Sequence, residues 1–83
     1  MTESVEVPLR DFQMIMLANF RYALGRQTYY VGVTVEYLIK WWDKMPEGYK
    51  EQIHGDIKHA IEHSMAGHDC DVAEWKKLLE LPL

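Results

Sequence analysis

Apolar side chains recur at intervals of three and four residues through most of this chain, which is the period of an α-helix. Pro8 suits the first turn of a helix, and Gly25 supplies a C-terminal stop. The pattern therefore predicts a helix over about residues 8–24. Its apolar surface is wide enough for the helix to be central or to face a second subunit. The expected buried stripe consists of Leu9, Phe12, Met16, Phe20 and Ala23.

The next segment carries two conflicting signals. Residues 29–35 are rich in residues that favour strands, which supports a β-strand. However, Val31, Val35, Leu38 and Trp42 are spaced as on one face of a helix. A single strand would have no partner with which to pair. We therefore predict a helix over about residues 30–45 and keep the strand as the alternative.

Pro46 and Gly48 mark the next break, and apolar spacing then predicts a helix over residues 47–63. Asp71 can cap a short C-terminal helix over residues 71–80, which Pro82 ends. The predicted fold is all-α, a small bundle of three main helices plus this short one. We expect the 83 residues to form a single domain, 1–83, with residues 1–7 as a flexible N-terminal arm.

Charge and cysteine content narrow the possible partners. The formal charge of −4 disfavours direct nucleic-acid binding, for which a basic domain is expected. The single cysteine, Cys70, cannot form an internal disulfide, which fits a reducing compartment. The N-terminus lacks a signal-peptide pattern, and no apolar run is long enough for a membrane span. We expect a cytoplasmic protein that does not bind membranes.

The sequence favours a non-enzymatic role without a cofactor. It contains no nucleophile elbow, phosphate-binding loop or dinucleotide fingerprint. His59 and His63 are four residues apart, as in helices that bind zinc, and His68 could add a third ligand. Ala60 follows His59, where the zincin pattern requires glutamate. A histidine metal site is therefore an alternative, beside the simpler interpretation of a solvated helix face.

Arginine and tyrosine cluster around the end of the first predicted helix. Arg21, Arg26, Tyr29 and Tyr30 could recognise an anionic nucleotide or phosphate, since arginine forks beside aromatic rings suit such ligands. In the alternative interpretation, the arginines only neutralise the negative end of the helix, and the tyrosines pack in the core.

Two further features suggest contact with another protein. Trp41 and Trp42 are adjacent, and neighbours on a helix point about 100° apart, so both cannot occupy one narrow core stripe. We assign Trp42 to the core and Trp41 to an interface. The second feature is a possible acidic helical face, composed of Glu47, Glu51, Asp56, Glu62, Asp69, Asp71 and Glu74.

The segment Phe20-Arg-Tyr-Ala-Leu-Gly-Arg-Gln-Thr-Tyr29, together with Trp42-Asp43, Ile57-Lys58-x-Ala60-Ile61 and Asp71-x3-Trp75, resembles a family of small accessory proteins of tailed bacteriophages and prophages. The resemblance covers residues 12–76. It implies a setting in which small acidic proteins inhibit host or defence proteins, as anti-CRISPR proteins do.

These observations lead to one main expectation and two alternatives. We expect a phage accessory protein that binds and inhibits a host or defence protein through its acidic face, as a homodimer. The first alternative is an oligomeric module that binds a nucleotide or phosphate through Arg21, Arg26 and Tyr29. The second is a metal-binding protein that uses its histidines.

Overall fold

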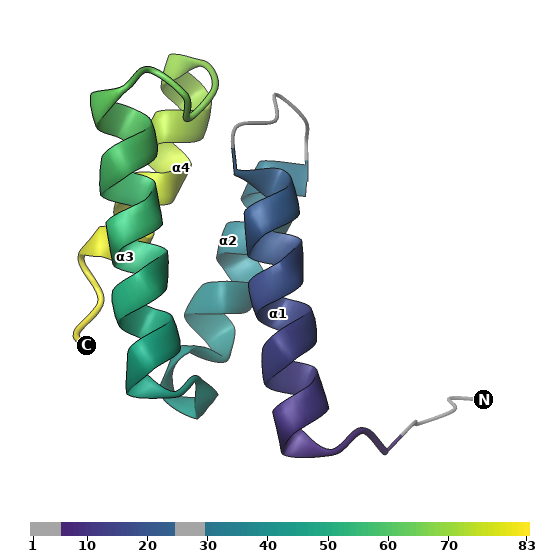
Figure 1. The fold of residues 1–83 in the computed structure, drawn as a ribbon. Helices are drawn as coiled ribbons and strands as arrows, with labels where there is room; N and C mark the ends of the chain where they lie inside the picture. Colours follow the sequence, from purple (N-terminus) through teal and green to yellow (C-terminus); the bar gives the residue numbers. More distant parts are fainter. Residues whose placement is uncertain (1–5, 25–29) are drawn as a thin grey trace.

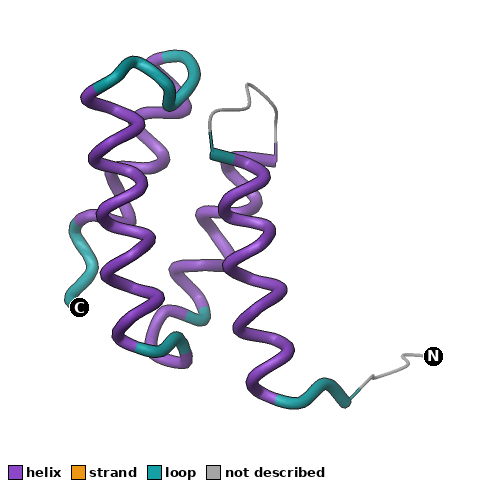
Figure 2. Tube along the Cα trace, in the orientation of Figure 1, coloured by secondary structure: helices purple, strands orange, loops and turns teal. Residues whose placement is uncertain are grey.

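The computed structural model of the chain describes residues 6–24 and 30–83, and most of these residues are helical (Figures 1 and 2). No strand occurs in these two ranges, so the prediction of an all-α fold is confirmed and residues 30–35 are helical. The elements are α1 (Leu9–Ala23), α2 (Tyr30–Lys40), the 3₁₀ turn η1 (Trp42–Lys44), α3 (Glu47–Glu62) and α4 (Asp69–Leu79).

The predicted helix over residues 30–45 is too long, because α2 ends at Lys40. Trp41 leaves the helical conformation, with φ −108° and ψ 15°. The N–H groups of Lys44 and Met45 then donate to the carbonyls of Trp41 and Trp42, three residues earlier. This tighter winding allows both Trp42 and Met45 to enter the core, where they are 5% and 4% exposed.

The last helix begins two residues before the predicted range of 71–80. His68 precedes α4, and its backbone N–H donates to Oδ2 of Asp71 at 3.0 Å. Asp71 therefore lies within the first turn of α4, where its carboxylate accepts the backbone N–H of His68. It does not precede the helix as predicted. With 11 residues, α4 is as long as α2, so the division into three main helices and one short helix is not confirmed.

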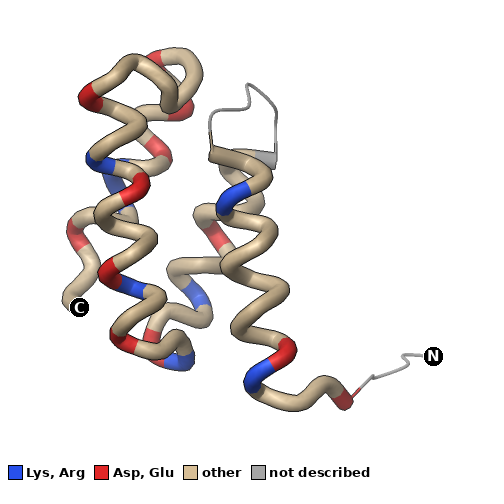
Figure 3. The backbone as a smooth tube through the Cα atoms, in the orientation of Figure 1, with Lys and Arg blue, Asp and Glu red and all other residues tan. Residues whose placement is uncertain are grey.

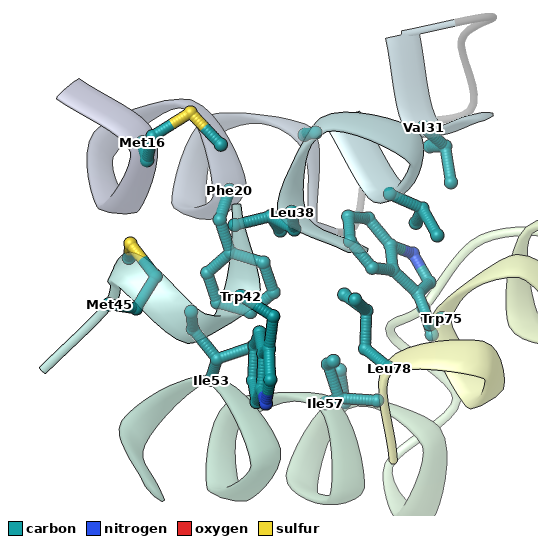
Figure 4. Packing of buried hydrophobic residues seen from close by; sticks show 14 residues of the cluster. Met16, Phe20, Val31, Leu38, Trp42, Met45, Ile53, Ile57, Trp75 and Leu78 are labelled. Atoms are coloured by element: carbon teal, nitrogen blue, oxygen red, sulfur yellow. The ribbon is translucent and has the colours of Figure 1, made fainter. Parts of the chain in front are cut away.

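The four helices of the described residues enclose one core (Figure 4). α2 packs against α1 and α4, and α3 packs against α4 and α1. At the centre the rings of Phe20 and Trp75 meet edge to face, with centroids 5.5 Å apart and planes at 89°. Both side chains are fully buried. Aromatic pairs of this geometry add about 0.5–1.5 kcal/mol beyond the burial of their area.

Not every residue of the predicted α1 stripe lies in this core. Met16, Phe20 and Ala23 are buried, but Leu9 is 58% exposed. Leu9 is the first residue of α1, and α1 begins at one end of the bundle (Figure 1). The helix thus leaves some of its apolar surface uncovered.

Candidate functional site

A groove of about 380 Å³ runs between α1 and α2 on the outside of the bundle. The side chains that line it are apolar or uncharged: Met16, Asn19, Tyr22, Ala23, Val33, Thr34 and Tyr37. Pockets of this size fall within the range of about 300–1,000 Å³ that is usual for binding sites. Two other hollows have volumes in this range, but their linings include charged side chains. The uncharged lining makes the groove the strongest candidate for an apolar contact surface.

Helical spacing explains how the groove is formed. On α1, Asn19 and Tyr22 are three residues apart and share one face. On α2, Val33 and Tyr37 are four residues apart, and they remain 41% and 49% exposed. Val31, Val35 and Leu38 occupy the opposite side of α2 and are buried. Because α2 is apolar on both sides, its packing into the core leaves an apolar surface facing outward.

Of the four predicted anion-binding residues, the structure describes the side chain of Arg21 alone. Arg21 points towards α3 and away from the groove, with Nε 3.9 Å from Oδ2 of Asp56. With the amide of Gln52 oriented so that its oxygen faces the guanidinium, this oxygen also accepts from Arg21. Arg26 and Tyr29 lie outside the described residues, and Tyr30 begins α2 without a described side chain. The nucleotide site stays a prediction.

The seven acidic residues of the predicted face do not form one face (Figure 3). Glu47, Glu51 and Glu62 are exposed on α3 and lie within about 60° of one another around its axis, in a stripe that Lys58 interrupts. Asp56 lies on another side of α3, next to Arg21. Asp71 is buried as part of the α4 cap.

The side chain of Trp41 is partly buried, whereas that of Trp42 is buried, as predicted. The indole of Trp41 packs edge-on against Phe12, with ring centroids 5.5 Å apart, and Nζ of Lys40 lies 5.3 Å from its centroid. Trp41 also lines a notch of about 360 Å³ at the start of α1. The other residues of this notch are Val7, Leu9, Phe12 and Lys44.

The three histidines that were candidate metal ligands do not converge. His59 and His63 are neighbours at the end of α3, with ring centroids 4.3 Å apart. His68 is exposed and precedes α4, on the other side of a turn. Within residues 6–24 and 30–83, no group of three His, Cys, Asp or Glu side chains could hold a metal ion. The three-histidine alternative therefore finds no support within these residues, where His68 is not brought to His59 and His63.

Sequence reasoning did not identify the groove between α1 and α2. One signal for it was present, since Arg21 and Arg26 are the only charged residues between Asp11 and Glu36. This stretch spans most of α1 and the first half of α2, and so little charge there supplies more apolar surface than one core face requires. Which of those side chains stay exposed depends on how the two helices pair.

Comparisons of the chain with protein-family models, curated proteins and solved structures give no match. None of the helices in the described part of the chain combines the length and the apolarity needed to span a membrane.

Proposed function

We propose that this protein is a non-enzymatic binding protein that contacts another protein through the groove between α1 and α2. The uncharged lining of this groove is the observation that carries the proposal. Val33 and Tyr37 line it and stay exposed, and Ile15, which is outside the lining but one helical turn before Asn19, is 52% exposed. Exposed apolar surface with tyrosine at its edge is typical of contact sites between proteins, and grooves between helices accept apolar helix faces.

The biological setting that we propose follows from the sequence resemblance. In that setting the protein is a phage or prophage accessory protein, and its partner is a host or defence protein. The stripe of Glu47, Glu51 and Glu62 is the part of the acidic surface that could contribute by charge complementarity. This stripe lies on α3, whereas the groove is formed by α1 and α2, so the two surfaces can be altered independently.

Two variants of the full chain separate these surfaces. The groove variant carries Val33→Glu and Tyr37→Lys, which makes the rim polar and leaves the net charge at −4. Glutamate four residues before lysine also favours the helix, so α2 is expected to remain folded. The stripe variant carries Glu51→Lys and Glu62→Lys. Circular dichroism melting checks that both variants fold.

The immobilised wild-type protein and the two variants are then incubated with extract of the host cell. We expect a specific protein to bind to the wild type and to the stripe variant, but not to the groove variant. If only the stripe variant fails to bind this protein, the partner binds the acidic stripe and not the groove. Equal retention by all three forms would refute both surfaces.

We further propose that two copies associate through the notch beside Trp41. Leu9 is 58% exposed there, and Val7 is 44% exposed. Light scattering on the wild type should give the mass of a dimer, and Leu9→Glu should give a monomer. Glutamate is favourable in the first turn of a helix, so this change tests association without weakening α1. A wild-type monomer at high protein concentration would refute the dimer.

A further inference from the structure

The last turn of α3 places two imidazoles side by side on the protein surface. His59 and His63 are both exposed, their ring centroids are 4.3 Å apart, and their planes meet at 44°. The N–H of His63 donates to the carbonyl of His59 at 3.0 Å, so the backbone keeps its helical spacing through His63. The positive φ of 57° at Ser64 then ends the helix. The two rings are thus held on one face by the backbone.

The ring nitrogens of this pair are available as ligands. Within the described residues, neither imidazole has a hydrogen bond to another group. His54, by contrast, is 8% exposed and uses its Nε2 on the carbonyl of Leu78. Neutral imidazole suits Ni²⁺, Cu²⁺ and Zn²⁺, and two histidines at positions i and i+4 of a helix can bind the same ion.

We propose that His59 and His63 form a two-histidine site for a divalent transition-metal ion of the late first row. The site supplies two ligands, because no third His, Cys, Asp or Glu side chain joins the pair within the described residues. The remaining coordination positions are open to water or to a ligand from another molecule. The bound ion links the two ends of the last turn of α3. This site is independent of the groove between α1 and α2.

The ligand chemistry determines which ions bind. Two nitrogen ligands follow the usual order of affinity, in which Cu²⁺ binds more tightly than Ni²⁺ and Zn²⁺. Mg²⁺ requires oxygen ligands and near-octahedral geometry, so it is not expected to bind here. If Mg²⁺ binds as tightly as Ni²⁺, the cations are attracted by the acidic surface and not by the imidazoles. That result would overturn the proposal.

The test is calorimetric titration of the full chain, prepared without a histidine tag, with Ni²⁺. We expect one ion per chain for the wild type. His59→Gln and His63→Gln should each weaken binding by at least about tenfold, since even groups outside the coordination shell contribute factors of about 10–100. His68→Gln is the matched control, because His68 is also exposed but lies apart from the pair, and the affinity of this variant for Ni²⁺ should equal that of the wild type.

A second measurement follows the fold instead of the heat of binding. Excess Ni²⁺ should raise the melting temperature of the wild type and of His68→Gln by several degrees, because the ion binds the ordered helix in preference to the unfolded chain. The same excess should raise the melting temperature of His59→Gln by clearly less, because the weakened site is less occupied. Wild-type affinity in either His59→Gln or His63→Gln, or an equal loss in His68→Gln, would refute the paired site.

Discussion

The imidazole of His54 stacks on the indole of Trp42, with ring centroids 5.3 Å apart and planes at 19°. Both side chains are buried, and each uses a ring N–H to hold the C-terminal part of the chain. His54 Nε2 bonds to the carbonyl of Leu78 at 2.8 Å, and Trp42 Nε1 donates to that of Pro82 at 2.6 Å. A carbonyl can only accept, so Nε2 of His54 carries a proton. This stacked pair connects η1 and α3 to the end of α4.

Replacement of His54 by leucine should destabilise the protein by about 1–2.5 kcal/mol. The change removes one hydrogen bond, worth about 0.5–1.5 kcal/mol, and the ring stacking. The carbonyl of Leu78 keeps the N–H of Leu81 as a donor, which limits the loss. Urea unfolding measures the effect. His59→Leu is the matched control on the exposed side of α3, and it should stay within about 0.5 kcal/mol of the wild type. An equal effect of the two changes would contradict this role for His54.

Trp42→Phe should cost about 1–3 kcal/mol, because it removes the donor to Pro82 and leaves part of a buried ring volume empty. Removal of Pro82 and Leu83, which are both exposed, takes away the acceptor and leaves the indole in place, so its cost should be smaller, about 0.5–1.5 kcal/mol. Thermal or urea unfolding of the two forms gives the comparison. If the truncated chain is the less stable of the two, the main contribution of Trp42 is not its packing.

The same substitution should have opposite effects at two glycines. Gly55 lies within α3, and a Cβ atom there would meet nothing within 4 Å, so Gly55→Ala should stabilise the fold by about 0.5–1 kcal/mol. Gly67 has φ +88°, and a Cβ atom there would lie 2.5 Å from Oδ2 of Asp71. Gly67→Ala should therefore destabilise the protein by about 1 kcal/mol or more. Unfolding midpoints that shift in the same direction would contradict this contrast.

Two acidic residues should differ in their contributions to stability. Asp56 and its partner Arg21 have side chains that are 38% and 57% exposed, and their closest atoms are 3.9 Å apart. Exposed pairs of this kind contribute about 0–1 kcal/mol, so Asp56→Ala should have little effect. Asp71 is 8% exposed and accepts the N–H of His68, so Asp71→Ala should cost about 1–2 kcal/mol. Chemical denaturation of both variants measures the difference. A larger loss for Asp56→Ala would show that the contact between α1 and α3 matters more than the cap.

The candidate surfaces could be predicted only in part. The sequence predicted different environments for Trp41 and Trp42, because two adjacent residues of a helix cannot share one core stripe. It also placed His59 and His63 on one face from their spacing alone. The groove could not be predicted from the sequence, because its residues come from two helices. In a sequence pattern, their outward-facing apolar side chains cannot be told from core residues. The acidic face was overestimated because the pattern did not show that Asp71 would be buried and that Asp56 would face Arg21.

Local spacing by itself determined that this chain is helical and which side of each helix is apolar. Val31, Val35 and Leu38 are buried as their spacing predicts. Only the tertiary structure decided where α2 ends, because the turn at Trp41 stacks Trp42 on His54 of α3 and places Met45 in the core. The tertiary structure also decided which apolar side chains remain exposed. Periodicity is a property of neighbours along the chain, whereas burial depends on contacts between helices that are distant in sequence.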